Sequence, residues 1–208
     1  MPGSPNSVYD HLIGAIREGT YGPGDRIREG EVAKELGLSR TPVRDALRRL
    51  ESRGLLVHEP HRGMVVRTLD HRRILELYFM REVLDGAAAE LAARNAVEVE
   101  LEMLDELLAA DRERVESGRS VTHSNLDYHD LIYRMARNGY LNETLEVLRT
   151  AMILLGPSTL DTPERARQAI AEHEAVVAAI RARDPEAASQ AAKRHIRSAL
   201  KARMSLSR

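Results

Sequence analysis

The stretch from Leu38 to Leu50 constrains the fold most, because it is predicted to form a helix with two chemically different faces. Apolar side chains recur three or four residues apart, the spacing of a buried helical stripe: Val43, Ala46, Leu47 and Leu50. Polar and basic side chains fall on the other side: Arg40, Thr41, Arg44 and Arg48. Such a helix packs against a core on one face and leaves a cationic surface on the other.

The ends of this helix are also marked in the sequence. Ser39 suits the N-cap, where its hydroxyl is predicted to accept a hydrogen bond from a backbone N–H of the first turn. Pro42 falls within that first turn, where a missing N–H costs little. Gly54 suits the left-handed position that ends a helix. The pattern therefore predicts a short, rigid helix over residues 39–53.

The positive charge of the chain is local. The 208 residues carry a formal net charge of −1, which by itself does not favour a nucleic-acid partner. Residues 39–53 nevertheless contain five arginines and only two acidic residues. A cationic helix of this kind suits the major groove of DNA, where arginine binds phosphate oxygens and guanine edges.

Composition narrows the class of protein. Hydrophobic residues make up 43% of the chain, which is enough for a core in one or two domains. Cysteine is absent, which excludes disulfides and thiolate metal ligands and is consistent with a reducing compartment. No apolar run approaches the roughly 18 residues of a membrane span, and the N-terminus has no signal-peptide pattern. We therefore expect a cytoplasmic protein with no membrane partner.

Shorter elements flank the cationic helix. Helices are predicted over residues 7–18 and 31–36, and short strands over residues 55–58 and 64–67. Two helices that follow one another across a tight glycine-containing turn at Gly37 have the helix-turn-helix pattern. The two strands enclose a hairpin tip that carries Arg62 and Gly63, and this hairpin is predicted to form a basic wing.

From residue 71 onward the apolar period is near 3.6 throughout. Helices are predicted over residues 71–96, 99–117, 121–138, 141–155, 162–182 and 184–204. The loops between them are short, so neighbouring helices are expected to be antiparallel. The predicted fold is mainly α, with a winged helix-turn-helix over residues 1–69 and an all-α antiparallel bundle of about six helices over residues 70–208.

The N-terminal motifs resemble the winged helix-turn-helix of the GntR family. They are Pro23-Gly24-Asp25-Arg26-Ile27, the run from Leu38 to Leu47, Gly54-Leu55 and Arg62-Gly63. Members of that family are bacterial transcription regulators that bind palindromic operators as homodimers. The resemblance implies DNA contacts from Ser39, Arg40, Thr41, Arg44, Arg62 and Gly63. Arg48 lies on the same face of the helix and is added to this set.

Three histidines in the second half are each predicted to point into the bundle. Asn125 and His129 are spaced to share one helix face, whereas His173 and His195 lie among small and apolar residues of two later helices. Neutral imidazoles with a side-chain oxygen suit Zn²⁺, Ni²⁺ or a similar divalent ion. Hydrogen-bonded core histidines would give the same pattern, so spacing alone leaves both interpretations open.

Residues 72–203 resemble the FCD ligand-binding domain of the FadR subgroup. The motifs are Arg81 to Asp85, Asn125 to Ile132, Asn138, His173 to Ile180 and His195-Ile196. Many members of that group hold a divalent metal through one Asp or Asn and three His, and by position these are Asn125, His129, His173 and His195. The metal is expected to be Zn²⁺, with Ni²⁺ and Mn²⁺ as alternatives. The usual Asp is Asn here, so weaker metal binding, or completion of the site by the effector's own carboxylate, is expected.

An effector site is predicted around Arg81, which falls within an otherwise apolar stripe. Burial of an unpaired guanidinium is costly, and a small organic acid would relieve that cost by a bidentate pair. An internal salt bridge to an acidic residue of the bundle would relieve it equally well. Tyr133 and Arg134 are predicted to line the same cavity.

These observations predict a ligand-responsive transcription regulator that binds double-stranded DNA as a homodimer. The resemblance favours a repressor with a small carboxylate effector near a divalent metal. A direct metal sensor and a purely structural metal are alternatives. A metal hydrolase is a further alternative, because a three-histidine metal can activate water. No acidic residue is placed by motif as a general base, so the protein is predicted not to be an enzyme.

Overall fold

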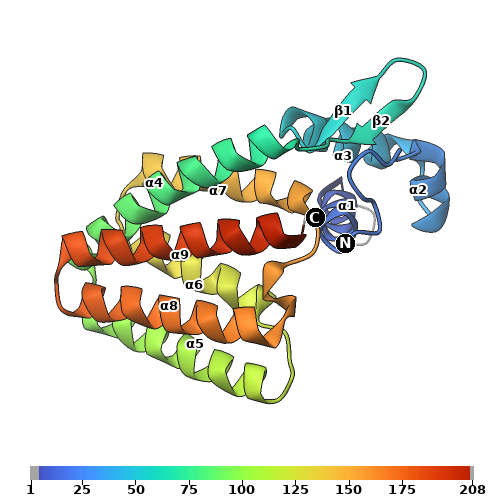
Figure 1. The fold of residues 1–208 in the computed structure, drawn as a ribbon. Coiled ribbons are helices and arrows are strands. Elements are labelled where there is room, and N and C mark those ends of the chain that lie inside the picture. Colours follow the sequence, from blue (N-terminus) through green and yellow to red (C-terminus); the bar gives the residue numbers. More distant parts are fainter. Residues whose placement is uncertain (1–4, 207–208) are drawn as a thin grey trace. The chain divides into compact units, whose positions relative to one another are not determined.

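The computed structural model describes residues 5–206, which form two compact units (Figure 1). The first unit combines the residues up to Ile74 with Val147–Pro157. The second unit combines Leu75–Glu146 with the residues from Ser158 onward. A segment distant in sequence therefore contributes to the first unit, and Leu154 from that segment is buried in its core.

Within residues 5–66, the first unit contains three helices and a hairpin: α1 (Pro5–Arg17), α2 (Glu29–Glu35), α3 (Arg40–Ser52), β1 (Leu56–Glu59) and β2 (Gly63–Val66). α3 packs against α1, α2 and β1. The apolar stripe of α3 is fully buried, as its spacing predicted: Val43, Ala46, Leu47 and Leu50. The opposite face of α3 is therefore the one that remains exposed.

The two ends of α3 differ in how well they match the prediction. At the C-terminal end Gly54 has a positive φ of 75°, and the N–H of Leu55 donates to the carbonyl of Leu50 at 3.0 Å, which confirms the expected helix stop. At the N-terminal end Ser39 occupies the N-cap, but its hydroxyl makes no capping hydrogen bond, so that prediction is wrong. The reason is Pro42, the third residue of the helix, which lacks the N–H that a cap hydroxyl commonly reaches.

The wing is a two-stranded antiparallel hairpin. Leu56 pairs with Val66, and Glu59 pairs with Gly63 at the tip. The segment before α2 runs beside β2, where the N–H of Ile27 donates to the carbonyl of Met64 at 2.9 Å. These additional backbone bonds fix the hairpin to the rest of the unit.

Six long helices follow: α4 (His71–Asn95), α5 (Glu98–Glu116), α6 (Thr122–Met135), α7 (Gly139–Met152), α8 (Pro163–Arg181) and α9 (Pro185–Leu206). Two short 3₁₀ helices lie between α7 and α8: η1 (Ile153–Leu155) and η2 (Thr159–Asp161). Figure 1 shows α4, α5, α6, α8 and α9 side by side as a bundle. The mainly α fold class, with a winged helix-turn-helix before a helical second half, is confirmed.

The core of the second unit is built from small and branched apolar residues. It includes Ala88, Ala92, Leu104, Tyr128, Met135, Val177, Ile180 and Ala188. α8 and α9 form an antiparallel hairpin and pack against each other along their length. In the described part of the chain, no helix is long and apolar enough to cross a membrane.

Candidate nucleic-acid interface and metal centre

The predicted DNA contacts of α3 lie on its exposed side. Arg40, Arg44 and Arg48 follow one another at intervals of one turn, and all three are exposed. Ser39 and Thr41 are exposed at the N-terminal end of the helix. Because the Ser39 hydroxyl does not cap α3, it is available for a contact outside the chain.

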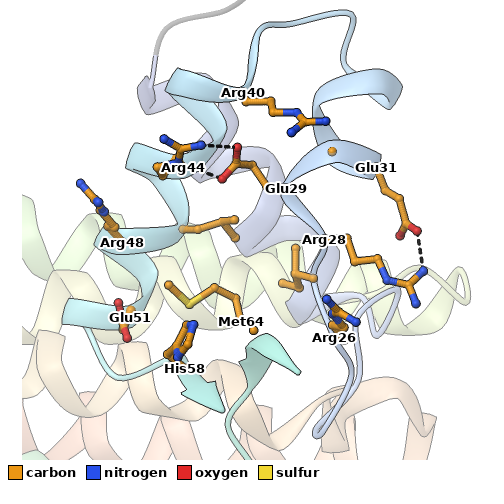
Figure 2. Close-up of a pocket in the computed structure, with 14 residues that line it drawn as sticks. Arg26, Arg28, Glu29, Glu31, Arg40, Arg44, Arg48, Glu51, His58 and Met64 are labelled. Carbon is orange, nitrogen blue, oxygen red and sulfur yellow. Dashed lines mark hydrogen bonds and ion pairs between the residues drawn. The ribbon is translucent and has the colours of Figure 1, made fainter. Parts of the chain in front are cut away.

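A groove of about 770 Å³ lies against this face within the first unit (Figure 2). Its lining includes five arginines and three glutamates: Arg26, Arg28, Arg40, Arg44, Arg48, Glu29, Glu31 and Glu51. The hairpin adds His58, Gly63 and Met64 to the lining. The groove is therefore cationic in balance, and it is bounded by α3 on one side and the wing on another.

Sequence reasoning found only part of this groove. It predicted the α3 arginines and Gly63, but it did not assign Arg26 or His58, which the backbone pairing beside β2 brings to the same place. Arg62 is absent from the lining. Its guanidinium donates to Glu59 at 2.6 Å and to the carbonyl of Gly24 at 3.0 Å.

Glu29 orients Arg44. Nε and Nη2 of Arg44 donate to the two carboxylate oxygens of Glu29 at 3.0 and 2.8 Å (Figure 2). These hydrogen bonds lower the pKa of Glu29 below its ordinary value. An exposed ion pair contributes little to stability, so its main effect is to hold the guanidinium in one direction on the exposed face of α3.

The three histidines converge within the second unit. His129 on α6, His173 on α8 and His195 on α9 each offer a ligand atom, and these atoms lie within 4.8 Å of one another. Nε2 of His173 and Nε2 of His195 are 3.4 Å apart. Two nitrogen ligands at about 2.1 Å from a tetrahedral ion are separated by roughly 3.4 Å, so this spacing fits a shared divalent ion.

Two carboxylates lie beside the Nδ1 atoms of two of these rings. Oε2 of Glu172 lies 2.8 Å from Nδ1 of His195, and Oδ1 of Asp85 lies 3.4 Å from Nδ1 of His129. A carboxylate at Nδ1 keeps the proton there and leaves the Nε2 lone pair available. Sequence reasoning assigned neither acid. Glu172 directly precedes His173, but only the packing of α8 on α9 shows that it serves His195.

Burial keeps two of the imidazoles neutral. Burial lowers the pKa of His195 to about 4, although the hydrogen bond to Glu172 opposes the shift. Burial, with the neighbouring charges of His195 and His129, lowers the pKa of His173 well below its ordinary value. Neutral imidazole is the form that binds a metal ion, so the residues present fit a divalent cation at physiological pH.

The fourth predicted ligand, Asn125, lies on α6 one turn before His129 and is half-buried. Both residues therefore project from the same side of α6. The assignment of its amide oxygen to the metal set stays a prediction.

Arg81 is not the unpaired cation that its position in an apolar stripe suggested. Its Nε lies 3.4 Å from Oδ2 of Asp85, and the hydroxyl of Tyr133 donates to Oδ1 of Asp85 at 2.7 Å. Burial raises the pKa of Asp85, but the Arg81 charge and the hydrogen bonds to the carboxylate outweigh it and leave that pKa well below its ordinary value. Arg134 is exposed, so the structure does not bring it to Arg81.

Two family models match the chain. The model described as bacterial regulatory proteins, gntR family, matches residues 5–66. The model described as the FCD domain matches residues 76–198.

Full-length relatives agree with these matches. The HTH-type transcriptional regulator YdhC of Bacillus subtilis is 30% identical over 88% of this chain and 83% of its own length. A protein of Paenarthrobacter nicotinovorans, described as a probable D-xylose utilization operon transcriptional repressor, is 33% identical over 92% and 84% of the two chains. The solved structure of Escherichia coli McbR/YncC has a TM-score of 0.83 at 25% identity and covers 100% of both chains. The two sequence relatives are described as transcription regulators and the matching family model as regulatory proteins, in agreement with the prediction that the chain is not an enzyme.

The lowered histidine pKa values predict how stability depends on pH. Below about pH 6.5 the unfolded chain takes up protons at His173 and His195 that the folded chain rejects, so folding is penalised. In the presence of a chelator, the free energy of unfolding should fall as the pH drops from roughly 6 to 5, by on the order of 1 kcal/mol per pH unit for each residue that stays neutral in the folded state. Urea denaturation followed by circular dichroism measures this slope.

A His195→Gln substitution should halve the slope, whereas His123→Gln, at an exposed position of α6, should leave it unchanged. Equal stability of the wild-type protein at pH 7 and pH 5 would contradict the neutral, buried state of the cluster.

Proposed function

This chain belongs to the GntR family of bacterial regulatory proteins and is a transcription regulator with an FCD domain. We propose that it represses transcription from a palindromic operator. We assign DNA reading to residues 1–69, and assign metal binding, effector binding and dimerisation to residues 70–208. The relative from P. nicotinovorans, which is described as a repressor, supports the sign of regulation.

The observation that carries the DNA-reading role is the cationic groove between α3 and the wing. Arg40, Arg44 and Arg48 present a row of guanidinium groups on a helix whose other face is buried. A helix of this width fits the major groove, and its arginines bind phosphates and guanine edges. Ser39, Thr41, Arg62 and Gly63 extend the proposed contacts at the two ends of the reading surface.

We propose that the regulator acts as a homodimer. A palindromic operator places its half-sites about 34 Å apart, so two reading units are needed. An exposed apolar stripe on α4 supports a second copy as the partner: Leu75, Phe79 and Val83, with Met80 beside them. Phe79 is the sole phenylalanine of the chain, and 64% of it is exposed.

We propose that His129, His173 and His195 hold a divalent ion together with Asn125. A set of three imidazoles and one oxygen suits Zn²⁺, with Ni²⁺ and Mn²⁺ as alternatives. The bound ion would supply positive charge that attracts an acidic effector. Asp85 and Glu172 would orient His129 and His195 for that role.

The proposed effector is a small organic acid that binds beside the metal. Arg81, Tyr133 and Arg134 were predicted to line its site, and the contacts of Arg81 and Tyr133 with Asp85 place these two side chains next to His129. A direct metal sensor is the second candidate, favoured by the convergence of the three histidines. A metal sensor would change its DNA affinity with metal alone, whereas the proposed regulator also needs the acid.

Arg44→Ala tests the reading face. An operator would first be selected from random-sequence DNA, and binding then measured by fluorescence anisotropy. A bidentate Arg–guanine contact is worth about 1–3 kcal/mol, so Arg44→Ala should weaken specific binding roughly 5- to 150-fold. Affinity should also fall about 10³–10⁵-fold between 50 and 200 mM salt if about 6–10 phosphates are contacted.

Arg119→Ala, an exposed arginine of the second unit, is the matched control and should leave operator affinity unchanged. Unaltered binding by Arg44→Ala, or a flat salt titration, would contradict the proposed reading mode.

Glu172→Gln tests the metal centre. Loss of a carboxylate that orients a metal-binding histidine typically weakens metal binding about 10- to 100-fold. The zinc affinity of the full-length chain would be measured by competition with a chelating dye. Glu174→Gln changes an exposed acid two residues along the same helix and should leave zinc affinity unchanged. Equal zinc affinity in all three proteins, or absence of zinc binding, would contradict the proposed centre.

A further inference from the structure

Arg165 is a second buried cation beside the histidine cluster. It is the third residue of α8, and only 7% of it is exposed. Its Nη2 donates to Oε2 of Glu172 at 3.0 Å. The same carboxylate oxygen lies 2.8 Å from Nδ1 of His195, so Glu172 links Arg165 to the cluster.

The other two nitrogens of this guanidinium have no acceptor. Nε and Nη1 of Arg165 are buried, and within residues 5–206 neither makes a hydrogen bond. A buried N–H without an acceptor loses its hydration and gains nothing in return, so folded proteins leave few of them. These two donors therefore point to an acceptor that comes from outside the chain.

The contrast with Arg81 shows which arginine is open to a ligand. Arg81 pairs with Asp85, and Tyr133 donates to the same carboxylate, so the charge of Arg81 is already neutralised inside the bundle. Arg165 shares its carboxylate with His195 and uses only one of its three nitrogens there. An incoming anion would have to displace a carboxylate at Arg81, but not at Arg165.

The charge balance of the cluster favours an anion at this place. The two arginines balance the two carboxylates, Asp85 and Glu172. A divalent ion at the histidines would add two positive charges beyond those that Asp85 and Glu172 already balance. A negatively charged ligand bound between the ion and Arg165 would reduce that excess.

We propose that Arg165 binds the carboxylate of a small organic acid through its Nη1 hydrogens, and that this side chain is the principal anchor of the effector. The inference rests on the proposed ligand-responsive function and deepens it by naming the residue that recognises the acid. Guanidinium donors bind carboxylate oxygens through short, charge-assisted hydrogen bonds, which a lysine ammonium cannot reproduce in the same geometry.

The test is a calorimetric titration of succinate into the full-length protein at constant ionic strength, with and without prior saturation by Zn²⁺. Arg165→Gln should weaken succinate binding at least 10-fold, and Arg165→Lys should weaken it by a smaller factor. Arg167→Gln removes an exposed cation two residues further along α8 and should change the affinity less than twofold. Circular dichroism checks the fold of each variant. If Arg165→Gln does not fold, the succinate affinity of Arg165→Lys relative to the wild-type protein tests the proposal.

Equal succinate affinity of wild type and Arg165→Gln would overturn the proposal, as would failure of succinate to bind the wild-type protein. Inorganic phosphate forms a second arm. Binding of phosphate, but not succinate, that depends on Arg165 would overturn the carboxylate assignment. Failure of Zn²⁺ to bind would instead refute the proposed metal centre, and the metal-free titrations would still decide the role of Arg165.

Discussion

The second unit depends on burying three imidazoles at one point, and two carboxylates make this burial possible. Each carboxylate also forms an ion pair with an arginine. Two series of contacts therefore meet at the histidine cluster. One runs from Arg81 through Asp85 to His129, and the other from Arg165 through Glu172 to His195. Buried charges are tolerated when they are paired and hydrogen-bonded, and both carboxylates, Asp85 and Glu172, meet that condition. The two series of contacts differ at the arginine. The charge of Arg81 is neutralised, whereas Nε and Nη1 of Arg165 have no hydrogen-bond acceptor. In the proposed site, the metal ligands would therefore lie on one side and the anion anchor, Arg165, on the other.

On the surface of the first unit, a carboxylate also orients a neighbouring side chain. Glu29 receives two hydrogen bonds from Arg44 and fixes a guanidinium that would otherwise sample many rotamers. On the surface the pair adds little stability, so its effect is to present the Arg44 guanidinium in one orientation. A carboxylate thus positions a candidate site residue in both units: Arg44 in the first, and His129 and His195 in the second. The two cases differ in burial. The exposed Glu29–Arg44 contact only orients a side chain, whereas burial of the carboxylate–histidine contacts also affects the protonation state of the imidazole.

Local patterns in the sequence predicted the elements but not the partners of individual side chains. The two faces of α3, the helix stop at Gly54 and the inward placement of the three histidines follow from spacing and backbone conformation, which are local properties. The capping hydrogen bond of Ser39 failed for a local reason that the sequence already contained, because a proline occupies the position of the usual donor. Contacts such as Glu172 with His195, or Asp85 with both His129 and Arg81, join different helices or depend on a rotamer. Helical periodicity gives the face of a residue, but the register between two packed helices decides which atoms meet.

X-ray absorption spectroscopy at the zinc edge tests the central claim most directly, because it reports the atoms around the ion without any assumption about regulation. The full-length protein loaded with one equivalent of Zn²⁺ should show nitrogen or oxygen neighbours at about 2.0–2.1 Å, with the multiple scattering of three imidazole rings. His173→Gln should reduce that scattering to two rings. A spectrum without imidazole scattering, with only oxygen neighbours around the ion, would contradict the account, since the converging histidines would then be core residues and not a metal centre.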